Sequence, residues 1–162
     1  MTDTLTSLPS GATASDRVLL DEIRRRRSEL RESMTALESA LAAAVGDDHG
    51  RWAVRVHVAL VELSADLRLH VHATEGPRGL HQELVDTEPR TAGAVERLAR
   101  DHVRMRAALD ALLLLLDGPY PVSDAEAIRS QAVALLGDLA RHRQRGADVV
   151  YEALHVDVGG ET

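Results

Sequence analysis

The sequence predicts an all-α protein, an antiparallel four-helix bundle with up-down-up-down topology. Apolar residues recur every three to four positions along four long segments, which is the spacing of one face of an α-helix. The connections between these segments are short and contain Gly, Pro and Asp, which favours antiparallel packing of consecutive helices. A chain of 162 residues is long enough to bury one sizeable core. Together these observations predict a single helical domain.

The first helix is expected over about residues 15–45, with an apolar stripe at Leu20, Ile23, Leu30, Met34, Leu37 and Leu41. The second extends to about residue 75, where Gly76-Pro77 ends it, and residues 79–89 form a connector that can contain a helical turn. The third covers about residues 90–116. A capping-box pattern at residues 123–126 opens the fourth. We therefore expect a disordered leader over residues 1–14, a bundle over 15–155 and a flexible tail over 156–162.

The composition of the chain excludes several classes of function. The formal net charge of −7 argues against non-specific nucleic-acid binding. The chain has no cysteine, which excludes disulfides, thiolate metal sites and a cysteine nucleophile. The first 15 residues have no apolar core, so they do not resemble a signal peptide, and the long apolar run at residues 111–116 is too short for a membrane span. We expect a cytoplasmic protein without nucleic-acid or membrane partners, and the sequence predicts no oligomeric state.

Each of the four apolar stripes is interrupted by one large polar residue. In chain order these residues are Arg27, His70, His102 and His142. Counting residues along antiparallel helices places all four within about one helical turn of the same height. Imidazole is the commonest neutral metal ligand, and bundle cores host such sites. This alignment predicts a functional site, and the alternative is a buried polar network with a structural role only.

Two carboxylates accompany this layer. Asp66 and Asp138 lie four residues before His70 and His142, a spacing that places each on roughly the same helix face as its histidine. They either lie on a solvated flank or pair with Arg27 inside the bundle, since a buried unpaired guanidinium is very costly. Arg27, Asp66 and Asp138 are therefore the candidate catalytic residues.

Three segments resemble the bacterial hemerythrin-like, or HHE cation-binding, domains. Residues 67–80, LRLHVHATEGPRGL, resemble the end of the second helix of that family. Arg100-Asp101-His102 resembles the histidine-bearing start of its third helix. His142 and the following residues, through Tyr151-Glu152-Ala153 to residue 159, resemble its fourth helix and tail. The resemblance covers about residues 16–160.

The family implies a four-helix bundle that holds two oxygen-bridged irons through histidine and carboxylate ligands. Its members bind oxygen, sense redox state or nitric oxide, or handle iron. Position by position, the resemblance implies that His70, His102 and His142 are metal ligands in this chain.

The remaining ligand positions differ from the family pattern. Arg27 occupies the histidine position of the first helix. Thr74 and Gly146 occupy the positions of the bridging carboxylates, with Glu75 displaced by one residue and Asp148 by two. Bridging carboxylates neutralise and space the two cations, and iron favours such oxygen ligands. A normal di-iron centre is therefore not expected.

These observations predict a remodelled core site. We expect the three histidines to bind one divalent ion, iron or zinc, or a small ligand, with water or an aspartate as a fourth ligand. The alternative is a metal-free enzyme that uses the former iron cavity for acid-base chemistry, such as isomerisation or cyclisation of a small molecule. A third possibility is a non-catalytic bundle whose polar layer fixes helix register.

Overall fold

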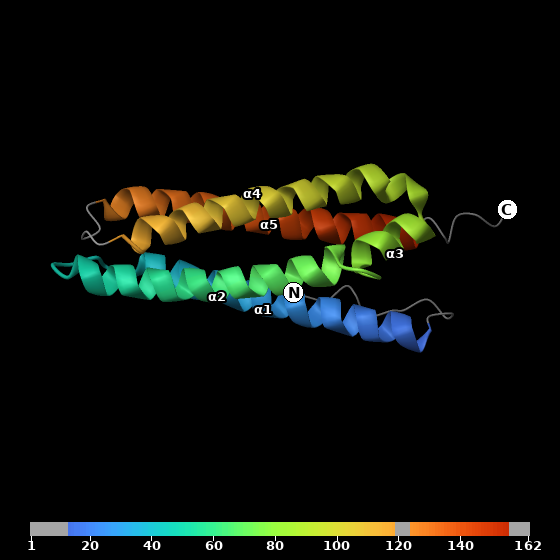
Figure 1. The fold of residues 1–162 in the computed structure, drawn as a ribbon, viewed down its shortest axis with the longest axis horizontal. Coiled ribbons are helices and arrows are strands. Elements are labelled where there is room, and N and C mark those ends of the chain that lie inside the picture. The colour runs from blue at the N-terminus through green and yellow to red at the C-terminus, as the bar shows by residue number, and fades with distance from the viewer. Residues whose placement is uncertain (1–12, 119–123, 156–162) are drawn as a thin grey trace.

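The computed structural model describes residues 13–118 and 124–155, without the side chains of residues 154 and 155. Four long helices form a bundle (Figure 1): α1 (Ala14–Ala42), α2 (His49–Glu75), α4 (Ala92–Leu116) and α5 (Ala125–His155). A short helix, α3 (Leu80–Thr87), and a 3-10 turn, η1 (Pro89–Thr91), connect α2 to α4. No strand occurs in the described ranges. The predicted all-α four-helix bundle is confirmed.

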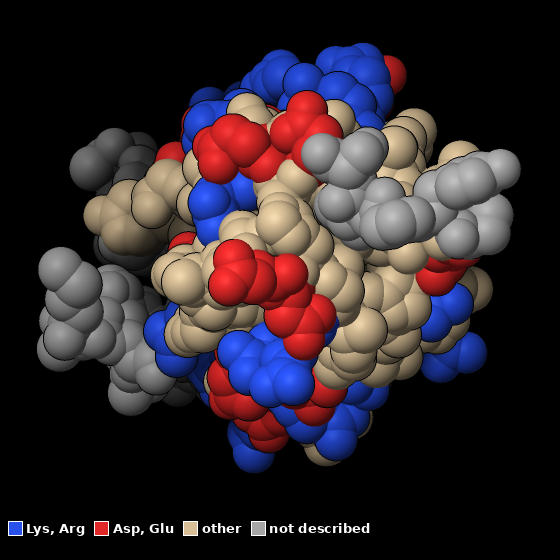
Figure 2. Space-filling model, turned by 90° about the vertical axis from the view of Figure 1, so that its left-hand side faces the viewer, with Lys and Arg blue, Asp and Glu red and all other residues tan. Residues whose placement is uncertain are grey.

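The four long helices are arranged in two layers. In Figure 1, α1 and α2 form one layer, α4 and α5 form the other, and each long helix runs opposite to the one before it. The short helix α3 lies at the end of the bundle where α2 gives way to α4. Figure 2 shows the opposite end, where acidic and basic side chains are interspersed, so this face carries no large field of one sign. None of the described helices is long and apolar enough to span a membrane.

The helices begin at side-chain caps that satisfy their first backbone donors. The Thr13 hydroxyl accepts a hydrogen bond from the backbone N–H of Asp16, and the Asp16 carboxylate accepts one from Thr13 in return. Asp48 caps α2 and Asp124 caps the first turn of α5. Thr13 and Ala14 of the expected leader thus belong to the start of α1, while residues 1–12 and 156–162, and Ser123 of the expected capping box, lie outside the described residues.

The first connection differs from the expected one, and the second contains more helix than the single turn expected there. Helix α1 ends three residues before its predicted limit, because Ala43 is extended and Gly46 has a positive φ of 58° that glycine adopts without steric cost. The connector after α2 contains the two-turn helix α3, whose buried Leu84 and His81 face the bundle. Tertiary burial of these side chains stabilises a helix that is too short to be stable alone.

The core consists of two apolar clusters. The larger joins buried side chains of all four long helices, up to Leu67 on α2, from Met105 onward on α4 and up to Leu139 on α5. The smaller joins α3 to the first turns of α4 and the last turns of α5. The layer of predicted site residues lies between these two clusters. His70 and His142 follow the last residue of the larger cluster on their helices, and His102 precedes its first residue on α4.

Candidate metal centre

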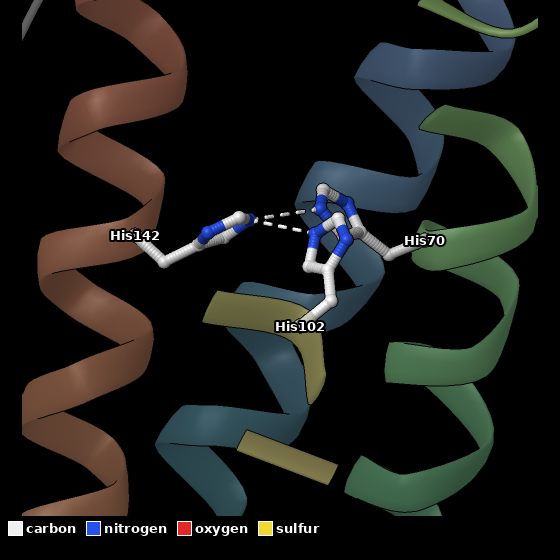
Figure 3. A group of neighbouring side chains, drawn as sticks. All are labelled: His70, His102 and His142. Atoms are coloured by element: carbon white, nitrogen blue, oxygen red, sulfur yellow. Dashed lines mark hydrogen bonds between the residues drawn. The ribbon is translucent and has the colours of Figure 1, made fainter. Parts of the chain in front are cut away.

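His70, His102 and His142 meet in the core of the bundle, one from each of α2, α4 and α5 (Figure 3). They are buried, with exposed fractions of 6, 1 and 3 %. The Nε2 atom of His142 lies 2.9 Å from Nε2 of His102 and 3.3 Å from Nε2 of His70. We call these three residues the histidine cluster. Their convergence agrees with the equal heights that residue counting predicts.

Helical spacing explains why these side chains point inward. Each histidine follows a buried leucine by three or four residues, Leu67 on α2, Leu98 on α4 and Leu139 on α5, all at most 3 % exposed. Side chains three and four positions apart share one helix face. The leucines turn that face to the core, so the histidines must point there too.

A carboxylate contacts the outer nitrogen of two of the rings. Nδ1 of His102 forms a short hydrogen bond with the Glu75 carboxylate at the end of α2. Nδ1 of His142 lies 3.5 Å from the Asp101 carboxylate of α4. Because an ionised carboxylate can only accept, both Nδ1 atoms carry the ring hydrogen. Both Nε2 atoms are then left as lone pairs that point toward each other.

Asp101 is held by arginines as well as by the histidine. Its side chain is buried, and the guanidiniums of Arg145 and Arg104 form ion pairs with its two oxygens. Burial alone would raise the pKa of Asp101, but the hydrogen bond and charge of Arg145, with smaller contributions from His142 and Arg104, hold it below its ordinary value. Asp101 is therefore ionised at neutral pH and fixes the orientation of the His142 ring.

The imidazoles of the histidine cluster are neutral at physiological pH. Burial, followed by the charges of the neighbouring rings and of Arg27, lowers the pKa of His70 to about 3. Burial also lowers the pKa of His102 and of His142 to about 4. Nδ1 of His70 is buried and forms no hydrogen bond with any described residue. The cluster thus offers unprotonated nitrogen ligands at neutral pH.

A fourth histidine covers one side of the cluster. His81 on α3 is 9 % exposed, and its ring stacks on that of His102 with centroids 5.8 Å apart and planes within 2°. Burial, with the neighbouring His102, lowers its pKa to about 4. The hydroxyl of Thr91 in η1 donates to the carbonyl of Leu84 and holds the last turn of α3. The short helix therefore closes the site from the end of the bundle.

Arg27 and Asp66 lie beside the cluster on α1 and α2. Arg27 is half-buried, and its charge is near enough to His70 to act on the pKa of that ring. Asp66 is also half-buried and accepts a short hydrogen bond from the hydroxyl of Ser33 on α1. The expected pairing of Arg27 with Asp66 stays a prediction.

Asp138 lies toward the outside of α5. Its carboxylate pairs with Arg141 on the next turn at 2.7 Å, and its side chain is 41 % exposed. This contact corresponds to the solvated flank that the sequence left open for Asp138. A pairing of Asp138 with Arg27 also stays a prediction.

The positions expected for bridging carboxylates hold no acid. Thr74 is buried, and its hydroxyl donates to the carbonyl of His70 at 2.9 Å. Gly146 has open space where a side chain would begin. The displaced acids are used elsewhere: Glu75 contacts the outer nitrogen of His102, and Asp148 accepts from Gln144.

Three residues of the site escaped the sequence analysis as functional candidates. Asp101 is the immediate neighbour of His102 in the chain, yet it contacts His142 on another helix. Glu75 follows His70 by five residues and contacts His102 instead. His81 has no periodic signal, because its helix is only two turns long. Adjacency to a candidate ligand was the available signal for Asp101.

Comparison with protein-family models, curated proteins and solved structures finds no match for this chain. The chemistry of the site therefore follows from its own residues. Three buried histidines, each offering one ring nitrogen within 4.8 Å of the others, can hold a metal ion.

Proposed function

We propose that the protein binds one divalent metal ion through the Nε2 atoms of the histidine cluster. One observation carries the proposal: carboxylates at Nδ1 of His102 and His142 leave two Nε2 lone pairs facing each other at 2.9 Å. Two acceptors at this distance cannot form a hydrogen bond with each other. Their lowered pKa disfavours a proton between them at pH 7. A metal cation satisfies both lone pairs.

The spacing of the nitrogens supports this assignment. Two nitrogens bonded to one ion at ~2.1 Å lie ~3.4 Å apart at a tetrahedral angle and ~3.0 Å apart at a right angle. The two Nε2 separations that involve His142, 2.9 and 3.3 Å, fall close to this range, and the ligand nitrogens of all three rings lie within 4.8 Å of one another. Carboxylates that bond the outer nitrogen of a ligand histidine fix its tautomer and raise its basicity, as Glu75 and Asp101 would. The cluster and its two acids are therefore matched to a bound ion.

The ligand set favours zinc over iron. Three neutral imidazoles with an open position suit Zn²⁺. Iron favours carboxylate oxygens, and Thr74 and Gly146 supply none at the positions expected for bridging acids. Such an ion polarises a bound water or small ligand. The helical architecture and the quoted motifs support a relation to hemerythrin-like domains. In that relation, a mononuclear site replaces the dinuclear one.

Metal titration of untagged protein tests the proposal. Cobalt(II) added to chelator-treated protein is expected to saturate at one equivalent per chain and to give the visible d–d bands of a low-coordinate site. His102→Ala should abolish this signal. His57→Ala is the matched control, because His57 lies on the side of α2 and pairs with Asp117 away from the cluster.

Two outcomes would contradict the proposal. Unchanged cobalt binding in His102→Ala would place the ion elsewhere. Two irons per chain in protein as isolated, with near-ultraviolet absorption from an oxo bridge, would establish a dinuclear centre instead.

A further inference from the structure

A groove between α2 and α4 lies next to the site but outside it. These two helices lie side by side (Figure 1). The groove encloses a cavity of about 160 Å³ lined by Ser64, Leu67, Arg68, Arg106, Leu109 and Asp110. Leu67 and Leu109 lie beneath it, each only 1 % exposed, so the surface of the groove is mostly polar. The four polar residues form its rim.

The donors on this rim are unused within the part of the chain that the structure describes. Ser64, Arg68 and Arg106 form no hydrogen bond or ion pair with any residue in the described ranges. Asp110 follows Arg106 by four residues, a spacing that permits an ion pair, yet these two side chains do not pair either. The other arginines of α4 whose ion pairs are described, Arg100 and Arg104, do bond to acids on their own helix. The groove thus holds two guanidiniums and a hydroxyl ready to donate.

The charge balance of the groove favours an anion. The rim contains two guanidiniums and one carboxylate, so it carries a net positive charge on a protein whose net charge is −7. Arg68 and Arg106 are both exposed, and the charge of Arg106 acts on the buried ring of His102, one helical turn away. Arginine binds carboxylates with paired, charge-assisted hydrogen bonds.

We propose that the α2–α4 groove binds a small organic carboxylate, with its carboxylate between Arg68 and Arg106. The volume of about 160 Å³ corresponds to roughly five waters at ~30 Å³ each, which is room for a chain of a few carbons. Asp110 forms the repulsive wall that limits the number of negative charges on the ligand. The proposal does not depend on a bound metal ion.

NMR titration of the full chain with sodium butyrate and sodium acetate tests the proposal. Saturable shifts of backbone amides are expected at residues 64–68 and 106–110 with both salts, because both ligands carry the carboxylate that the arginines recognise. Arg68→Gln with Arg106→Gln should weaken butyrate binding at least about tenfold, because both charge-assisted hydrogen-bond donors are lost. Arg55→Gln with Arg97→Gln makes the same change of charge on the same helices outside the groove. This control should change the affinity for butyrate by no more than about twofold.

The sign of the Asp110 effect gives a second test. Asp110→Asn should tighten butyrate binding, whereas Glu38→Gln, on the exposed side of α1, should not. Shifts absent from the groove, equal losses in the two arginine double variants, or weaker binding in Asp110→Asn would each overturn the proposal. The titration is repeated after removal of metal with a chelator. Binding that disappears then would assign the carboxylate to a metal ion and would also overturn the groove.

Discussion

Four buried imidazoles make the stability of the metal-free protein depend on pH. The histidine cluster and His81 are each at most 9 % exposed, and burial lowers the pKa of His70 to about 3 and those of the other three to about 4. In the unfolded chain these groups titrate near their ordinary pKa of 6.5. Acidification from pH 7 to pH 5 should therefore change the free energy of unfolding.

The sign follows from proton counting. Between pH 6.5 and about 4, the unfolded chain binds protons at these four rings and the folded chain does not, so the free energy of unfolding falls as pH falls. Above pH 6.5 the effect vanishes. Each ring contributes at most ~1.4 kcal/mol per pH unit, which gives a limit of about 5.5 kcal/mol per unit for four. Typical domains have ~5–15 kcal/mol in total, so this chain should unfold within the window.

Urea unfolding followed by far-ultraviolet circular dichroism, at pH 7, 6 and 5 with a chelator present, measures this dependence. Asp101 does not interfere, because its lowered pKa confines its effect to pH below 4. Replacing all three residues of the histidine cluster by methionine should leave about a quarter of the slope, due to His81. A free energy of unfolding that stays constant between pH 6.5 and 5 would refute the neutral, buried state of the cluster.

Three further predictions concern single residues. Asp101→Asn should lower zinc affinity about 10–100-fold in a chelator competition assay, because it replaces the charged acceptor of a ligand histidine by a neutral amide, whereas Asp138→Asn should not. Equal affinities would contradict a role of Asp101 in the site. Arg27→Gln should raise zinc affinity by on the order of 1 kcal/mol, roughly fivefold, since it removes a cation that faces the cluster; lower affinity would contradict this. Gly146→Ala should stabilise the fold by ~0.5–1 kcal/mol in thermal unfolding, because the position is helical with open space. Gly137→Ala, whose new methyl would lie 3.3 Å from Arg141, should gain less, and the reverse order would be evidence against the packing at both glycines.

Much of the fold could be predicted because it depends on local patterns. The apolar stripes and the Gly-Pro or Asp-rich breaks define where α2 ends at Glu75 and α4 at Leu116, as expected. The end of α1 was predicted three residues too late, since alanines at 42–44 permit a helix but do not require one. A helical turn could be expected in the connector after α2, but not the full length of α3, because that depends on burial of His81 and Leu84 against other helices.

The sequence by itself determined that three histidines would meet. One polar residue on each apolar stripe, at heights that agree to about one helical turn, suffices for this, because a stripe must face the core and the rise per residue is fixed. The sequence did not determine the hydrogen-bond partners. Pairing of Glu75 with His102, and of Asp101 with His142, depends on the rotation and offset of helices that belong to different parts of the chain. A hydrogen bond forms or fails over a few tenths of an ångström, whereas residue counting resolves about 5 Å, so only the packed bundle decides which ring nitrogens remain free to bind a metal ion.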